Sequence, residues 1–219
     1  MRKVLLVLSI LTVFLALCLP PQVLADTTYL TNVTIDSTGY WQGRAGDVWS
    51  ISSNFLNYST QNTLWNTGLS TITLTGSGNQ IFNLAGTDQG GSPSGYTNNF
   101  AWGTLSITGG GSLTLTANST SGYAQYVTTI SGLTISSGVI TNISEAAGSN
   151  LNIYYLASNP GNSYLQGLTY NLEGGGKLIP VNPAAVPALG PLAGLLLIVG
   201  LTGLAAVRGR IKEKGKTTN

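Results

Sequence analysis

The residues of this chain that could carry chemistry are carboxylates, because histidine is absent. Between residues 26 and 183 the acids are Asp26, Asp36, Asp47, Asp88, Glu145 and Glu173. A glycoside hydrolase needs two carboxylates on either side of one bond, and folding could bring Asp47 and Asp88 together. The six acids are dispersed, however, and the only bases in this segment are Arg44 and Lys177. We therefore expect a non-enzymatic protein, with a glycan-degrading β-helix enzyme as the third hypothesis.

We also expect no metal site and no cofactor. The only cysteine, Cys18, lies in the apolar N-terminal stretch, and histidine is the commonest transition-metal ligand. The loop at Asp88 is rich in glycine but lacks the D-x-D-x-D-G spacing of a calcium loop. Residues 173–177 read E-G-G-G-K, which lacks the first glycine and the trailing Ser/Thr of a phosphate loop.

Aromatic side chains offer a second kind of chemistry, the stacking of flat rings on sugars. The candidates are Trp41, Trp49, Trp65, Trp102, Tyr40, Tyr58, Tyr123 and Tyr126. The alternative is that these rings fill the core, because each buries a large apolar area, and we favour it. A surface module that binds extracellular polysaccharide is therefore the second hypothesis.

The charge of the chain is unevenly distributed. The whole chain has a formal net charge of +2, yet residues 26–183 hold six acids and two bases. The excess basic residues lie at the two ends of the chain. A negatively charged segment does not attract polyanions, so we expect no nucleic-acid partner.

The elements that would position these side chains are predicted to be strands. Aliphatic residues alternate with Thr, Ser or Asn in residues 72–75, 105–108, 113–116, 133–136, 151–153 and 168–172. This alternation places apolar side chains on one face and hydroxyls on the other, and threonine suits a pleated surface. No helical apolar stripe of useful length appears between residues 26 and 180. We predict that residues 26–180 form one all-β domain, long enough for a core.

Two arrangements of these strands remain open. Glycines punctuate the strands, and the similar openings Gly103–Ile107 and Gly132–Ile135 suggest repeated units of a parallel β-helix, a solenoid. The alternative is an antiparallel β-sandwich, in which residues 105–107 and 113–115 form a hairpin across Gly109–Gly111. The spacing between similar strands is irregular. We favour the solenoid and keep the sandwich as the alternative.

The N-terminus has the pattern of a signal peptide. Arg2 and Lys3 precede an uncharged stretch, and a pair of prolines at 20 and 21 ends any helix there. Small residues at the −3 and −1 positions predict cleavage by signal peptidase between Ala25 and Asp26. We therefore expect residues 1–25 to direct export through the general secretion machinery and to be removed.

The C-terminus has the pattern of a membrane anchor. Residues 181–188 form a Pro/Ala linker that should be extended. Residues 189–207 are apolar and would span about 28 Å as a helix, close to the thickness of a bilayer core. Residues 208–219 form a basic tail, expected in the cytoplasm, with Arg208, Arg210, Lys212, Lys214 and Lys216.

These C-terminal residues resemble a PEP-CTERM sorting signal. The motif at the entrance of the apolar run consists of Val186, Pro187, Ala188, Leu189, Gly190 and Pro191. It is most similar to the variant that begins Ile-Pro-Thr-Leu, although Ala188 stands where the main form has glutamate. The resemblance implies that an exosortase-like transpeptidase cleaves the tail of an inner-membrane intermediate.

The same resemblance implies where the protein would work. Cargo of this class passes to the cell surface or extracellular matrix, often in biofilm-forming Gram-negative bacteria. The first hypothesis for this chain is therefore a non-enzymatic role in biofilm matrix, adhesion or envelope structure.

Overall fold

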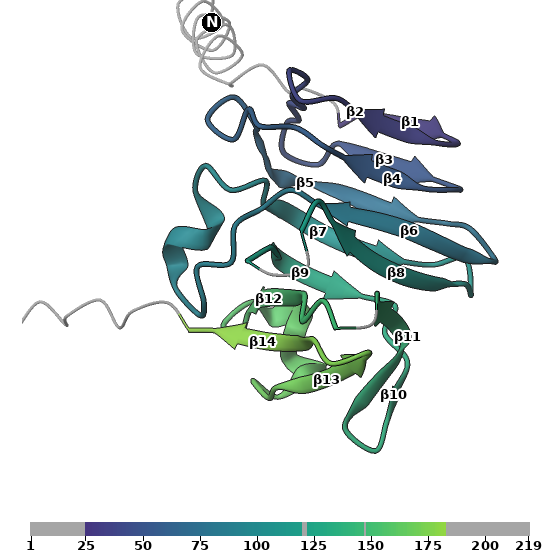
Figure 1. The fold of residues 1–219 in the computed structure, drawn as a ribbon, viewed down its shortest axis with the longest axis vertical. Coiled ribbons are helices and arrows are strands. Elements are labelled where there is room, and N and C mark those ends of the chain that lie inside the picture. Colours follow the sequence, from purple (N-terminus) through teal and green to yellow (C-terminus); the bar gives the residue numbers. More distant parts are fainter. Residues whose placement is uncertain (1–24, 120–121, 147, 183–219) are drawn as a thin grey trace, which may run out of the picture. The chain divides into compact units, whose positions relative to one another are not determined.

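The computed structural model describes residues 25–119, 122–146 and 148–182, which form an all-β domain (Figure 1). This confirms the all-β prediction. Within these ranges, no helix has the length and apolar character needed to cross a membrane. The sorting motif, the predicted span at 189–207, the basic tail and residues 1–24 of the predicted signal peptide lie outside the described residues.

The strands form one sheet whose members fall into two series. The first series is β1 (Thr27–Leu30), β3 (Val48–Ile51), β5 (Thr67–Leu74), β7 (Trp102–Ile107), β9 (Ala124–Ser131), β12 (Asn152–Leu156) and β14 (Lys177–Val181). The second series is β2 (Val33–Ile35), β4 (Phe55–Asn57), β6 (Asn79–Leu84), β8 (Ser112–Ala117), β11 (Val139–Glu145) and β13 (Tyr170–Glu173). The two-residue β10 (Ile135–Ser136) pairs with β11.

All neighbours within a series are parallel, and consecutive strands of the chain belong to different series. The predicted hairpin of residues 105–107 with 113–115 is therefore wrong. β7 pairs with β5 and β9, whereas β8 pairs with β6 and β11. The glycines at 109–111 lead the chain from one series to the other instead of folding it back.

The predicted equivalence of Gly103–Ile107 and Gly132–Ile135 is also wrong. Leu105 is in register with Ile72 on one side and with Ile130 on the other. The segment after Gly132 instead leads into β10, whose side chains are exposed. A short run of alternating residues does not distinguish a core strand from an exposed one, because both show the same period of two.

One hydrophobic core contains side chains from both series. It includes Ile72 and Leu105 from the first series and Phe82 and Leu115 from the second, all fully buried or nearly so. Trp49, Trp65 and Trp102 are also buried in this core. The preference for core aromatics is thus confirmed for these three tryptophans.

The two series meet where β13 pairs antiparallel with β14. The buried Glu145 holds this turn, because its carboxylate accepts hydrogen bonds from the backbone N–H groups of Leu151 and Gly176. Gly174 and Gly175 have φ angles of 114° and 128°, which side chains rarely adopt. The E-G-G-G-K run is therefore the turn that closes this end of the sheet.

Exchange of Gly109 for alanine is expected to destabilise the fold by about 1–3 kcal/mol, the usual cost of overpacking. A Cβ atom there would lie 2.2 Å from the Thr75 carbonyl oxygen and 2.3 Å from that of Gly76. Gly78→Ala is the matched control, because a Cβ atom at Gly78 meets no heavy atom within 4 Å. Denaturant unfolding checks this, and equal midpoints for the two variants would contradict the close packing of the corners.

Candidate functional site

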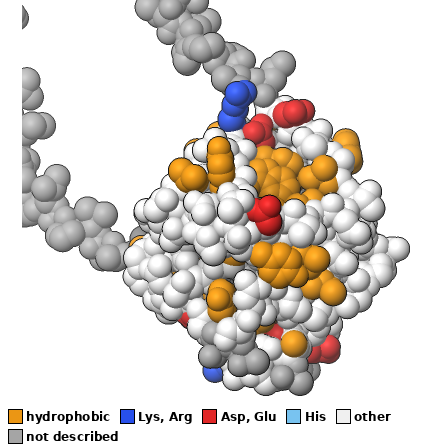
Figure 2. Space-filling view, turned by 45° about the horizontal axis from the view of Figure 1, so that its top comes forward, with side chains coloured by type: hydrophobic (Ala, Val, Ile, Leu, Met, Phe, Trp, Pro, Cys, Tyr) orange, Lys and Arg blue, Asp and Glu red, His pale blue; other side chains and the backbone are white. Residues whose placement is uncertain are grey.

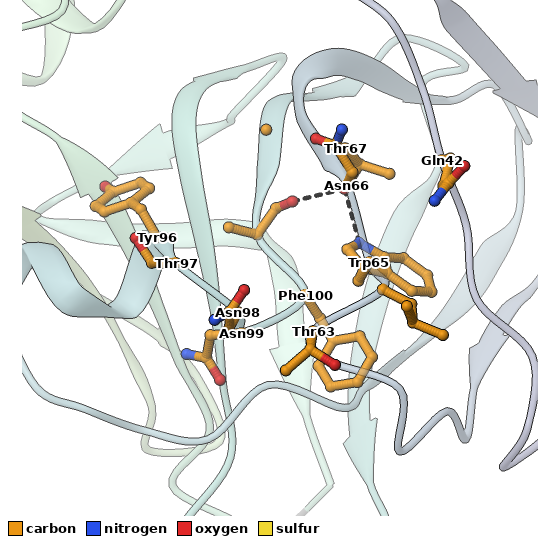
Figure 3. Close-up of a pocket in the computed structure, with 13 residues that line it drawn as sticks. Gln42, Thr63, Trp65, Asn66, Thr67, Tyr96, Thr97, Asn98, Asn99 and Phe100 are labelled. Atoms are coloured by element: carbon orange, nitrogen blue, oxygen red, sulfur yellow. Dashed lines mark hydrogen bonds between the residues drawn. The ribbon is translucent and has the colours of Figure 1, made fainter.

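A groove of about 440 Å³ lies beside β5 and β7 (Figure 3). Residues 63–68, which lead into β5, form one wall, and residues 96–101, which lead into β7, form the other. Beside the exposed apolar side chain of Leu64, the rim carries amides and hydroxyls from Gln42, Thr63, Asn66, Thr97 and Asn98. Such side chains both donate and accept hydrogen bonds, as the hydroxyl groups of a sugar do.

The floor of the groove is rigid. The Trp65 indole N–H donates to the Thr67 hydroxyl at 2.7 Å, and that hydroxyl donates to the Ala101 carbonyl at 2.6 Å (Figure 3). The rings of Trp65 and Phe100 pack edge to face at 5.1 Å. Both rings are at least 93% buried, so they support the groove and offer little face for stacking on a ligand.

The wall at residues 97–100 has an unusual backbone. Asn98 and Phe100 have φ angles of 50° and 56°, a left-handed region that is uncommon for residues other than glycine. Between them, the buried Asn99 side chain accepts from the Thr87 N–H at 2.7 Å and donates to the Thr87 carbonyl at 2.9 Å. Strained residues of this kind persist only where their surroundings determine them. The backbone that carries Asn98 is therefore held in one conformation on the rim.

The loop that carries this wall is anchored on the outer face of the first series. Asp88 accepts hydrogen bonds from the Tyr154 hydroxyl at 2.8 Å and the Asn152 amide at 3.0 Å. The Tyr126 hydroxyl donates to the Gly90 carbonyl at 2.7 Å, and its ring stacks on Tyr154 at 4.7 Å. Burial raises the pKa of Tyr126 from its ordinary value of 10 to about 12, which takes the loss of this donor still further from neutral pH.

The structure does not bring Asp47 and Asp88 into one site. Asp47 lies just before β3 and accepts from the backbone N–H groups of Arg44 at 2.8 Å and Asp26 at 3.1 Å. Asp88 instead bonds to side chains of β12. Each carboxylate is thus engaged in holding a segment of the chain. Within the described ranges, no three acidic, cysteine or histidine side chains group as metal ligands.

Of the predicted processing residues, the structure describes Ala25 and Asp26, both exposed. Asp26 is bonded into the fold, because its carbonyl accepts from the Val48 N–H at 2.8 Å. The two bases of the segment lie near opposite ends of the first series of strands, Arg44 before β3 and Lys177 in β14.

Sequence reasoning missed the groove. Gln42, Asn66 and Asn98 are far apart in a chain full of polar residues, so nothing singles them out. The one available signal was the pair of asparagines before Phe100, because asparagine tolerates positive φ better than other side chains.

The Asp47 contacts are expected to make stability depend on pH. Hydrogen bonds from the Arg44 and Asp26 backbone lower the pKa of Asp47 below its ordinary value of 3.8. The stabilisation is present above pH 3.8 and is lost as the pH falls through the lower folded pKa. Asp47→Asn should therefore melt below wild type at pH 7, with a difference that shrinks in acid.

Thermal unfolding between pH 2 and 7 measures this difference. The exposed Glu173, in β13 at the closed end of the sheet, provides the control Glu173→Gln for loss of one negative charge. A deficit of the Asp47 variant that is the same at every pH would contradict the account.

Comparisons with known proteins add no family to this description. No family model matches the chain, and no curated protein or solved structure matches it significantly. The function therefore has to be argued from the residues and the geometry.

Proposed function

We propose that this chain is an exported, non-enzymatic structural protein of the cell surface or extracellular matrix, whose domain is a two-sided β-solenoid. The observation that carries the proposal is the parallel pairing within both series of strands. A parallel stack buries a continuous core between its sides and suits a rigid, elongated element. The hairpin that the alternative β-sandwich required, between residues 105–107 and 113–115, is not formed.

Hydroxyl and amide side chains on the outer faces support the same proposal. In the first series, the Ser131 hydroxyl donates to that of Ser106 at 3.0 Å. In the second series, Thr114 bonds to Asn79 at 3.0 Å and to Ser144 at 3.1 Å. These bonds run from strand to strand along the stack. They reinforce the pairing from outside and leave a polar surface.

The contacts of Asp26 support the proposed export step. Cleavage after Ala25 would turn the Asp26 N–H, 3.1 Å from the Asp47 carboxylate, into an ammonium group. A charged donor strengthens such a hydrogen bond. After this cleavage the mature chain would begin at Asp26, whose backbone carbonyl is hydrogen-bonded to β3. Sorting through residues 186–191 by an exosortase-like enzyme rests on the sequence resemblance.

Intact mass is expected to show a protein that begins at Asp26 and ends near Val186 or Pro187, released from the producing cells. Pro187→Ala should block the second cut, because it removes the proline of the sorting motif. Pro183→Ala, in the same linker, is the control and should be processed normally. A wild-type protein that retains Arg208 to Asn219 and stays in the membrane would contradict sorting.

A second candidate function, polysaccharide binding, is favoured by the groove. Its rim amides are exposed, and the backbone that carries Asn98 is held by the Asn99 side chain. A pre-organised backbone loses little conformational entropy when a ligand binds. Uncharged rim side chains suit a neutral glycan.

Gln42→Ala and Asn66→Ala are each expected to weaken binding of matrix polysaccharide about three- to tenfold, the effect of one lost hydrogen bond. Asn171→Ala, an exposed amide in β13 away from the groove, is the control. Calorimetric titration with polysaccharide purified from the producing cells measures the change. Equal affinities for all three variants would exclude the groove as the binding site.

A further inference from the structure

In the described ranges, both end strands of the sheet order lie at the same end of the domain (Figure 1). The order begins at β1, which pairs only with β3, and finishes at β2, which pairs only with β4. At the opposite end, β13 and β14 pair with each other as well as with their series neighbours. Apart from the two-residue β10, free edges among the strands of the described residues are therefore confined to the β1–β2 end.

The backbone of β1 directs one row of polar groups away from β3. The carbonyls of Asp26 and Leu30 accept from β3 and its following turn, at 2.8 and 3.0 Å. Bonding groups alternate in direction along a strand, so the N–H and C=O groups of Thr27 and Tyr29 point to the free edge. On β2, the same alternation leaves those of Thr34 free.

Both edge strands are short and are flanked by Asp26 or Asp36, but neither has a charge or a proline within the strand itself. They read T-T-Y-L and V-T-I, whereas natural proteins often place charged residues or proline on exposed edges. The Tyr29 side chain is 79% exposed. The core at this end is covered by four hydrophobic side chains that are only partly buried, those of Leu30, Val33, Ile35 and Trp41. Figure 2, which turns this end forward, shows hydrophobic side chains gathered there.

We infer that a second copy of this chain covers this end, with β1 pairing with the β1 of that copy. The opposite end of a second copy is closed, so the edge that it can offer is the same one. Two identical edges meet about a two-fold axis, which makes the paired strands antiparallel. Such a contact closes with two copies and does not grow into a fibre.

The direction of the free groups fits this pairing. With Thr28 on the two-fold axis, Thr27 of each copy lies opposite Tyr29 of the other. Both residues have their N–H and C=O groups on the free edge, so each opposed pair exchanges two hydrogen bonds. The acidic Asp26 lies opposite the apolar Leu30 in this register, so the two carboxylates do not face each other.

The test measures the molar mass of the protein, expressed from the full chain, by sedimentation equilibrium. Intact-mass measurement identifies the first and last residues of the same sample. Tyr29→Pro removes a free-edge N–H but leaves the β1–β3 ladder, and proline is tolerated on edge strands. Tyr29→Lys places a charge on the same edge and keeps the test valid if the proline variant fails to fold. Leu69→Lys is the control, since Leu69 is 72% exposed but lies in the interior strand β5.

Wild type and Leu69→Lys are expected to be dimers, and both Tyr29 variants should dissociate at least tenfold more readily. Monomeric wild type that begins at Asp26 would overturn the inference. Monomeric wild type that begins at Met1 would also overturn it, in favour of residues 1–24 as the cover. If both Tyr29 variants remain dimers, the contact lies elsewhere. The same conclusion follows if Leu69→Lys dissociates as readily as the Tyr29 variants.

Discussion

Hydrogen bonding between strands of one series, whose paired residues are 21 to 35 positions apart, is the constraint on which the rest of this structure depends. Thr27 pairs with Val48 at the short extreme and Thr67 with Trp102 at the long one. The described residues hold no cysteine, so no disulfide joins these strands. The interior strands satisfy their backbone mainly through their neighbours in the series, and the alternation of side chains then buries the main core between the two series.

The connections between the strands differ in length and in what holds them. Corners such as Gly109 approach the preceding backbone so closely that they have no room for a side chain. The longer connections are held by single buried polar side chains, Glu145 at the closing turn and Asn99 beside the groove. Glu145 and Asn99 thus each position a segment of the chain, and Asn99 does so in the wall of the groove.

Local patterns predicted the strands but not their partners. The alternation at residues 72–75, 105–108 and 113–116 lies within or at the ends of β5, β7 and β8, because side-chain period is a property of each strand alone. The partner of Leu105 depends on where a glycine corner leads the chain, and glycine permits both a hairpin and a corner. The groove was not predictable for a related reason, since Gln42, Asn66 and Asn98 meet only through the pairing of distant strands.

Within each series, strands pair with strands that are not their neighbours along the chain, and a disulfide test addresses this pairing most directly. Ser106 and Ser131 are register partners with hydroxyl oxygens 3.0 Å apart. In a Cys18→Ser background, Ser106→Cys with Ser131→Cys should oxidise readily to an intramolecular disulfide, seen by intact mass. Ser106→Cys with Thr114→Cys, the pair that a hairpin would join, should stay reduced. Oxidation of only the second pair would contradict the account.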